Sequence, residues 1–321
     1  MNDVHTGAGM NAMQPEQAFV STVLTWKRCT SANVPIDVAR ASDISCPQRF
    51  VYAYSMEMTV VDAPRSIAGR VAALWSLRGN PQGEYSGLPK PFVELVVSLQ
   101  GHHFWHNGEQ GSSLEFEYGW LMPIQNGPRF ATTIGSLHLI GARMPVDTAC
   151  ALFGPGIHDH GSLPVPLDCL IGHEAALLRE QLIEQQYTLA QLRVLASWLS
   201  GRLSDPVSRV LPAAIAPIGW RADRLAGAMG LSMRGLRRHF RQRFGIGPKF
   251  WLQLNRFDRV LSANMRRDSL AALAADFGFS DQSHLTTEFR RFAGRPPSEY
   301  LKTRASHAAP DAAPHFVPDE D

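Results

Sequence analysis

Apolar side chains recur at helical spacing from residue 221 to residue 245, which predicts two short helices with a tight turn between them. Leu225 and Met229 mark the apolar side of the first helix. Gly230 follows at the point where a helix C-cap needs a positive φ, and Ser232 stands at an N-cap position that opens the second helix. The pattern predicts a helix-turn-helix unit.

The second of these helices has two chemically different faces. Positions three or four apart share a face of a helix, so apolar side chains gather on one side: Leu236, Phe240 and Phe244. The opposite side carries four arginines: Arg234, Arg237, Arg238 and Arg241. Such a helix suits a DNA major groove, where guanidinium groups reach guanine edges and phosphates. A solvated basic face is the alternative that this helix alone leaves open.

The same pattern returns between residues 270 and 297, which indicates an internal repeat. The turn Met229–Ser232 has its counterpart in Phe277–Ser280, and one inserted residue precedes the next apolar match. Residues 249–267 between the two units suit one helix of about 16 residues, spanning roughly 25 Å. Two recognition helices held in this way suit successive major grooves about 34 Å apart.

Two stretches, LSMRGLRRHFRQRFGIGP (231–248) and GFSDQSHLTTEFRRFAGRPPSEY (278–300), resemble the two-part signature of the AraC/XylS transcription regulators. The linker arginines Arg256 and Arg259 are also in place. The resemblance extends over residues 205–304. It implies an all-α domain of seven helices in two helix-turn-helix subdomains, with double-stranded DNA as the partner.

The resemblance also assigns site residues by their position in the signature. Those implied to read base edges are Arg234, Arg237, Arg238, Gln282, Ser283 and Thr287. The candidates for phosphate contacts, with solvated surface as the alternative for each, are Arg241, Arg243, Arg290 and Arg291. Thr287 departs from the family, which usually has arginine there. Glu288 follows it, and only Arg290 adds positive charge to that face. The second unit is therefore expected to read fewer bases and to serve mainly as a backbone clamp.

Charge is distributed unevenly along the chain, although the formal net charge is only +2. Residues 1–200 hold 12 Lys and Arg against 17 Asp and Glu, whereas residues 201–304 hold 19 against 8. The remaining residues, 305–321, hold 4 acidic residues and no Lys or Arg. The basic part is the one with the repeated helical units, as attraction to phosphate requires.

Residues 18–170 are predicted to form a β-rich sensory domain of the α+β class. β-branched and aromatic residues bounded by Pro and Gly predict strands in 49–61, 91–101 and 136–144. Helices are expected in residues 65–79 and 145–154, the second with Pro145 near its start and Gly154 past its end. The order of these elements resembles, more loosely, the sensory half of one branch of the same family. That implies a small-molecule effector without identifying it.

Histidines cluster in two places, His102–His106 and His158–His160. A cupin-like barrel binds metal through such a pair of histidines with a carboxylate, for which Glu115 or Glu117 would serve. Surface histidines in loops are the alternative, and the surrounding Gly, Pro and Asp residues favour it. We therefore expect no metal and no cofactor.

No enzymatic activity is expected either. The cysteines lack CxxC spacing and are typical of small core residues in a reducing compartment: Cys29, Cys46, Cys150 and Cys169. A repair domain with a reactive cysteine would need a thiolate beside His or Arg, and Cys150 and Cys169 lie in apolar surroundings. Phosphate-loop and GxSxG motifs are absent from the sequence. A metal- or ligand-binding enzyme domain fused to a DNA-binding module is the alternative.

The flanking and connecting segments complete the predicted organisation. Residues 1–17 are expected to be a disordered leader without features of a secretory signal. Residues 171–204 form a helical connector whose apolar stripe either covers the sensory sheet or makes a homodimer contact. The Ala- and Pro-rich acidic tail, residues 305–321, is expected to be disordered. No apolar run reaches membrane-spanning length.

Together these features predict a cytoplasmic, sequence-specific DNA-binding transcription regulator. A small molecule or a partner at the N-terminal domain would control it by changing the arrangement of the two halves or of two protomers. The family habit favours an activator, which would make RNA polymerase a partner.

Overall fold

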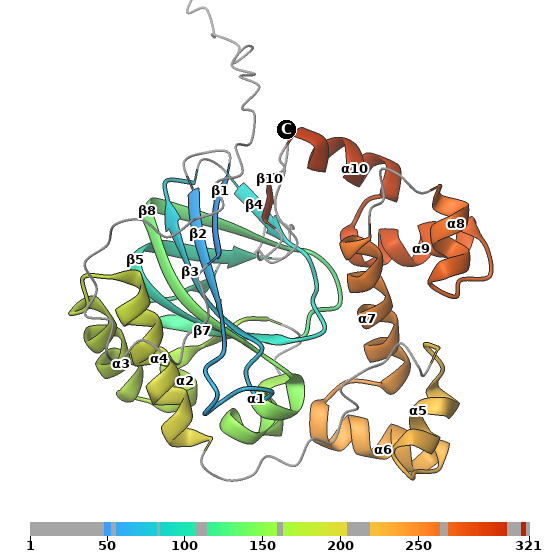
Figure 1. Ribbon diagram of the computed structural model, residues 1–321, viewed down its shortest axis with the longest axis horizontal. Coiled ribbons are helices and arrows are strands. Elements are labelled where there is room, and N and C mark those ends of the chain that lie inside the picture. The colour runs from blue at the N-terminus through green and yellow to red at the C-terminus, as the bar shows by residue number, and fades with distance from the viewer. Residues whose placement is uncertain are drawn as a thin grey trace, which may run out of the picture.

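The computed structural model describes residues 48–52, 56–81, 84–106, 114–158, 163–203, 219–263, 269–306 and 316–318. These residues form a bent antiparallel sheet with helices against one of its faces, followed by a separate group of helices (Figure 1). The leader predicted for residues 1–17 lies outside the described residues. The β-rich N-terminal part and the helical C-terminal part confirm the predicted fold class.

The sheet has the strand order β1-β2-β3-β8-β5-β7-β9, and every pairing between its strands is antiparallel. Off this path, β4 pairs with β8 and β10, and β6 pairs with β5. The strands are β1 (Gln48–Tyr52), β2 (Met56–Asp62), β3 (Ala73–Gly79), β4 (Glu84–Gly87), β5 (Val93–His106), β6 (Leu114–Glu115), β7 (Gly119–Met122), β8 (Arg129–Met144), β9 (Val165–Pro166) and β10 (Phe316–Pro318).

The sheet bends where its two longest strands, β5 and β8, lie side by side. Their register shifts on both sides of Gln100, which marks an irregularity of the β-bulge type. Gly101 has a φ of +95°, and a Cβ atom there would lie 2.7 Å from the carbonyl oxygen of Ser136. Only glycine permits this close approach. The bend gives the sheet a concave inner face and an outer face.

One predicted element is wrong. Residues 65–79 were expected to form a helix, but Ala73–Gly79 form strand β3 between β2 and β8. The reason is that both faces of this strand are buried: Leu74 belongs to the core on the outer face and Trp75 to the core on the inner face. A short apolar run without period-two alternation cannot be distinguished from a buried helix by periodicity. The other predicted helix is confirmed as α1 (Val146–Phe153).

Helices cover the outer face of the sheet. After α1 come a 3-10 turn η2 (Pro155–His158), α2 (Leu167–Ile171), α3 (Glu174–Ile183) and α4 (Thr188–Arg202). Helix α3 packs on β5, and α4 packs on β3 and β8. The fully buried side chains of α3 and α4 include Leu178, Leu182, Leu192, Leu195 and Leu199.

The apolar stripe of the predicted connector therefore covers the sheet of the N-terminal domain. Leu177, Ile183 and Tyr187 are exceptions, since they are exposed by 44%, 48% and 73%. The homodimer contact stays a prediction.

The C-terminal part consists of helices in the described ranges that repeat in pairs. They are α5 (Ala222–Ala228), α6 (Met233–Phe244), α7 (Pro248–Ser262), α8 (Leu270–Asp276), α9 (Gln282–Ala293) and α10 (Pro297–Ser306). Helix α7 lies between the α5–α6 pair and the α8–α9 pair (Figure 1), and its 15 residues agree with the long linker helix predicted there. Residues 204–218, where the family pattern places a further helix, lie outside the described residues.

Within the predicted disordered tail, residues 316–318 are described as β10, which pairs with β4, and α10 reaches residue 306. The rest of the tail lies outside the described residues. The domain boundaries stay predictions. None of the described helices combines the length and the apolar character that a membrane crossing requires.

Candidate nucleic-acid interface and ligand cavity

The two helix-turn-helix units share one turn geometry. Gly230 and Gly278 occupy the same place in each unit, with φ values of +66° and +69°. The next residue, Leu231 or Phe279, donates its N–H to a carbonyl of the preceding helix at 2.8 Å in both cases. These left-handed glycines end α5 and α8 and turn the chain into the second helix of each unit.

The second helix of each unit begins with a side-chain cap. The Ser232 hydroxyl accepts a hydrogen bond from the backbone N–H of Gly235 at 3.1 Å, as the N-cap prediction requires. In the second unit Asp281 caps α9 and accepts from the N–H of His284 at 2.8 Å. The cap therefore falls one residue later than in the first unit, where the sequence repeat has its inserted residue.

Buried aromatic residues fix both second helices against α7. Phe240 of α6 contacts Trp251 with ring centroids 5.7 Å apart, and Phe289 of α9 contacts Phe257 at 5.2 Å. The inward faces are fully or almost fully buried at Leu236, Phe240, Phe244, Leu285, Phe289 and Phe292. This packing determines which face of each helix is left outside.

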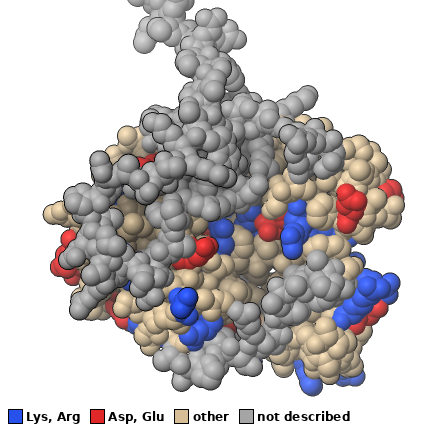
Figure 2. Space-filling view, in the orientation of Figure 1, with Lys and Arg blue, Asp and Glu red and all other residues tan. Residues whose placement is uncertain are grey.

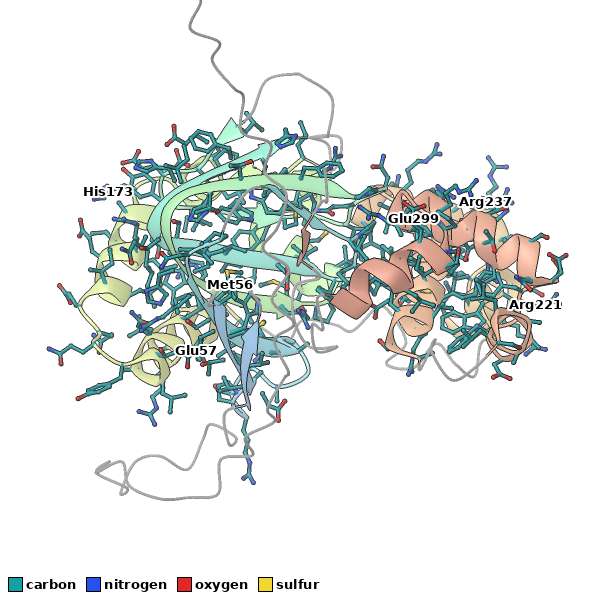
Figure 3. The ribbon with its side chains drawn as sticks, turned by 90° about the horizontal axis from the view of Figure 1, so that it is seen from above. Met56, Glu57, His173, Arg221, Arg237 and Glu299 are labelled. Atoms are coloured by element: carbon teal, nitrogen blue, oxygen red, sulfur yellow. The ribbon has the colours of Figure 1, made fainter. Side chains whose placement is uncertain are left out.

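The outward face of α6 carries the predicted arginine row. Arg234, Arg237, Arg238 and Arg241 are all exposed. No hydrogen bond or ion pair to another described residue holds any of these four guanidinium groups. Arg237 points away from the ribbon into solvent (Figure 3), and blue Lys and Arg atoms lie along the outer edge of this part of the molecule (Figure 2). The face is free to contact an anionic surface.

The outward face of α9 is polar but carries less charge. Gln282, Ser283 and Thr287 are exposed, as is Arg290. Glu288, which follows Thr287 in the sequence, does not share this face. Glu288 is only 5% exposed and points inward.

Glu288 forms a buried ion pair with Arg256 of α7. The two guanidinium–carboxylate distances are 2.9 Å from Nε and 2.6 Å from Nη2, so the pair is bidentate. Arg256 also donates to the carbonyl of Gly278 at 3.2 Å and lies 3.9 Å above the ring of Phe279. Gln253 donates to Glu288 at 2.9 Å. Arg256 thus joins α7, α9 and the turn of the second unit, a structural role that the sequence pattern did not reveal.

The four phosphate candidates differ in their surroundings. Arg243 lines an open cleft of about 390 Å³ next to Cys150 of α1. Arg291 donates to Gln253 at 3.3 Å and lies over the ring of Phe250. Arg241 and Arg290 are exposed, and all four assignments stay predictions.

The N-terminal domain contacts the helical part through a half-buried ion pair. Lys90 Nζ lies 2.8 Å from Asp258 Oδ1 on α7, the helix shared by both units. Burial lowers the pKa of Lys90, and the charge of Asp258 opposes that shift. Helix α1 also contacts α6.

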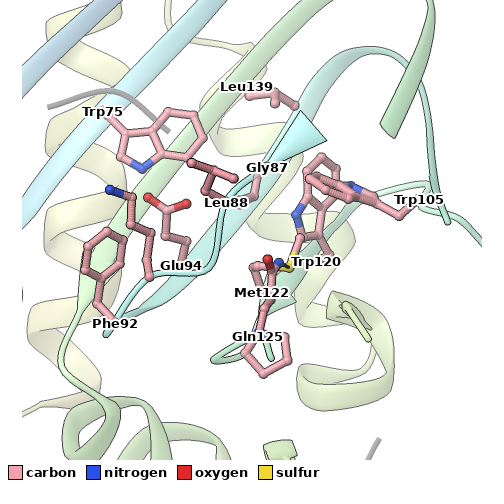
Figure 4. Close-up of a pocket in the computed structure, with 13 residues that line it drawn as sticks. Trp75, Gly87, Leu88, Phe92, Glu94, Trp105, Trp120, Met122, Gln125 and Leu139 are labelled. Atoms are coloured by element: carbon pink, nitrogen blue, oxygen red, sulfur yellow. Dashed lines mark hydrogen bonds between the residues drawn. The ribbon is translucent and has the colours of Figure 1, made fainter. Parts of the chain in front are cut away.

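A small cavity lies between the strands on the inner face of the sheet (Figure 4). Its volume is about 50 Å³, and most of its wall is apolar. Its lining includes Trp75, Lys90, Glu94, Trp105, Trp120, Met122 and Gln125. These seven residues come from four segments that are distant in sequence, so no local motif could have identified them.

The histidine clusters take different positions. His103 is fully buried and its ring nitrogens lie 3.0 Å from the Thr133 hydroxyl and 3.2 Å from the Gln100 carbonyl, and burial lowers its pKa to about 4. His102 lies 2.9 Å from Glu115 on the surface. Among the described residues no three His, Cys, Asp or Glu side chains gather as a metal site would require. The side chains of residues 158–160 lie outside the described ones.

Two of the cysteines can be placed. Cys150 is buried and its pKa is raised to about 12, chiefly by burial. A thiol in this state is a poor nucleophile. Cys169 is exposed, whereas Cys29 and Cys46 lie outside the described residues.

Comparison with known proteins identifies the C-terminal region. Residues 225–303 match the family model described as "Helix-turn-helix domain". The chain is 32% identical over 133 residues to the HTH-type transcriptional activator RhaS of Escherichia fergusonii, and 30% identical to RhaS of Escherichia coli O1:K1. Each match covers 40% of this chain and 42% of the relative, so less than half of either protein is aligned.

Among solved structures, ToxT from Vibrio cholerae is similar at 14% identity, covering 73% of this chain and 98% of that chain, with a TM-score of 0.38. A second ToxT structure, bound to (E)-4-(8-methylnaphthalen-1-yl)but-3-enoic acid, is 16% identical and covers 71% and 97%, with a TM-score of 0.40. The family match over residues 225–303 agrees with the paired turns and caps described above. The C-terminal region of this chain is therefore a helix-turn-helix domain of the AraC/XylS type.

Proposed function

We propose that this protein is a sequence-specific DNA-binding transcription regulator. The observation that carries the proposal is the exposed arginine row of α6, on the second helix of a helix-turn-helix unit with its opposite face buried. Relatives named as transcriptional activators support a regulator rather than an enzyme. Activation, contact with RNA polymerase, a homodimer and a cytoplasmic location are further parts of the proposal, which rest on the family resemblance.

Helix α6 is the main base reader in this proposal. Arginine forks bind guanine edges in the major groove, and Arg234, Arg237 and Arg238 stand near the N-terminal half of α6, the part that enters the groove in such units. Helix α9 offers Gln282, Ser283 and Thr287, which reach fewer base atoms.

Control by a small molecule is the second part of the proposed function. The inner cavity of the N-terminal domain is lined by Lys90, and the ammonium group of Lys90 binds Asp258 on α7. A ligand that moves Lys90 would weaken the contact between the cavity and the helix that both units share. Such a ligand binds one arrangement of the two domains better than the other, as control by an effector requires.

Binding of the full-length protein to fragments of its own upstream region tests the DNA-binding part. Nonspecific competitor DNA is included, and two salt concentrations are compared because phosphate contacts make affinity fall with salt. We expect one fragment to be retained by the wild type and lost by the Arg237→Ala/Arg238→Ala double variant. Arg193→Ala is the matched control, because Arg193 is an exposed arginine on α4 of the other domain.

The binding is also measured with cell extract added, because the extract would supply a missing effector. The proposal fails if competitor DNA removes the wild type from every fragment both with and without the extract. It also fails if the double variant and the Arg193→Ala control bind alike.

A further inference from the structure

The inner cavity contains buried polar atoms that no described residue satisfies. The indole Nε1 atoms of Trp75 and Trp105 and the Oε1 atom of Gln125 lack hydrogen-bond partners. These side chains are only 2%, 7% and 4% exposed, so bulk water does not reach them freely. Native proteins pair almost all buried polar groups. Three unpaired atoms lining one cavity indicate a bound molecule that pairs them.

The walls of the cavity are flat aromatic surfaces. Trp105 and Trp120 meet edge to face with centroids 5.9 Å apart, and Phe116 packs on Trp120 at 5.4 Å. Trp75 lies directly over Gly141 of β8, where a Cβ atom would come within 2.3 Å of the indole ring. The glycine therefore fixes the place of this indole. Rigid rings of this kind favour a planar aromatic guest.

The charged groups at the rim already compensate one another. Lys90 pairs with Asp258 at 2.8 Å, and Arg143 pairs with Glu94 at 3.0 Å. Figure 4 shows the Glu94 carboxylate on the side of the cavity that the Trp75 indole nitrogen faces. A charged ligand would have to compete with Asp258, Glu94, Lys90 or Arg143 for a counter-ion that is already paired, which is costly.

From these observations we infer that the cavity binds a small, uncharged aromatic molecule whose carbonyl oxygen accepts a hydrogen bond from an indole N–H. The inference deepens the effector part of the proposed function and names the chemical class of the effector. Of the three unpaired atoms, two are indole N–H donors and one is an amide acceptor. The site therefore favours a ligand that carries an oxygen acceptor.

The cavity has to widen to admit a ring. Its volume is about 50 Å³, whereas a cavity that holds benzene measures about 150 Å³. Met122 and Lys90 are the flexible residues of the wall, because both side chains are long and unbranched. Displacement of Lys90 would take its ammonium group away from Asp258, so entry of the ligand and loosening of the domain contact are one event.

Calorimetric titration of the full-length protein, without DNA, with four molecules of similar shape tests the inference. Acetophenone carries the carbonyl oxygen, and α-methylstyrene replaces that oxygen with a methylene group. Benzoate and benzamidine carry a negative and a positive charge in the same position. We expect acetophenone to bind at least about 5-fold more tightly than α-methylstyrene, which corresponds to one net hydrogen bond, and more tightly than both charged probes.

Variants locate the site. Trp75→Phe and Trp105→Phe keep an aromatic ring but remove the N–H, so we expect at least one of them to weaken acetophenone about 5- to 10-fold and leave α-methylstyrene unchanged. Trp198→Phe is the matched control, because the Trp198 N–H already donates to Glu174 outside the cavity.

Equal binding of acetophenone and α-methylstyrene to the wild type would overturn the inference, as would preference for a charged probe or binding of none of the four. These outcomes are independent of the proposed DNA binding. Upstream DNA retained by a protein that ignores all four probes contradicts the inference alone, and acetophenone binding without DNA binding contradicts the regulator alone.

Discussion

The two helix-turn-helix units have the same framework but differ in what they expose. Both place a glycine with positive φ in the turn, a capped second helix and buried aromatic residues against α7. The first unit exposes a row of arginines on α6, whereas the second exposes Gln282, Ser283 and Thr287 on α9. The acidic residue of α9, Glu288, is used inside the domain to hold Arg256.

This difference shows which positions the repeat constrains. Buried and turn positions recur because packing and backbone geometry leave few alternatives. Exposed positions are free to differ, and we propose that the two units have different roles in DNA binding because of these positions. The first reads bases, and the second, anchored to α7 by its ion pair, clamps the backbone.

The largest expected effect comes from breaking the anchor of the second unit. Arg256→Ala leaves Glu288 buried without its partner, so we expect a loss of about 3–5 kcal/mol in the free energy of unfolding. Chemical denaturation measures it. Arg259→Ala, an exposed arginine on the same helix, is the control and should stay within about 0.5 kcal/mol of the wild type. Similar losses of unfolding free energy in the two variants would show that the ion pair of Arg256 does not stabilise the second unit as we expect.

A smaller effect separates base reading from backbone contact. Arg238→Ala should cost about 1–3 kcal/mol of binding free energy on the preferred site and relax specificity at one base pair. Arg290→Ala should weaken all sequences alike and reduce the salt dependence of binding. Competition binding with single-base variants of the site measures both. If Arg238→Ala kept full discrimination, the face assigned to α6 would be incorrect.

Each unit contains one helix that is capped by a serine hydroxyl, and the two capping hydrogen bonds have the same length. The Ser232 hydroxyl caps α6 and the Ser269 hydroxyl caps α8, each accepting a backbone N–H at 3.1 Å. Ser232→Ala and Ser269→Ala should each destabilise the protein by about 1 kcal/mol, measured by thermal unfolding. A large cost for one and none for the other would show that the two capping hydrogen bonds do not contribute equally to stability.

Acid should distinguish the caps of the two recognition helices. A hydrogen bond from the His284 N–H, helped by the Ser280 hydroxyl, lowers the pKa of Asp281, whereas Ser232 does not titrate. The carboxylate cap therefore stabilises α9 above the unfolded pKa of about 4, and this contribution is lost as the pH falls through the lowered pKa of the folded state. We expect Asp281→Ser to reduce the loss of stability between pH 5 and pH 2, measured by denaturation at each pH. An unchanged pH profile would contradict the role of this cap.

Much of the helical domain could be predicted from the sequence because its signals are local. Glycine turns, capping residues and helical spacing each act within a few residues, and they placed α5, α6, α8 and α9 correctly. The inward position of Glu288 also has a local signal that the sequence analysis did not use, since Glu288 stands three residues after Leu285 and four before Phe292, both on the buried face. Helical phase would have placed it inside.

The N-terminal domain was less predictable because its determinants are non-local. Strand β3 is buried on both faces and lacks alternation, so it was mistaken for a helix. The cavity brings together Trp75, Trp105 and Gln125 only after the long strands β5 and β8 pair and bend. No spacing in the sequence shows these contacts.

We propose above all that the first unit recognises bases and that the second mainly contacts the DNA backbone. The most direct test is to select binding sites from a random DNA pool with the full-length protein. We predict two half-sites about one helical turn apart, one strongly specified and the other nearly free in sequence, with Arg238→Ala altering the strong half-site alone. Two equally specified half-sites, or a change in the weak half-site on Arg238→Ala, would contradict the claim.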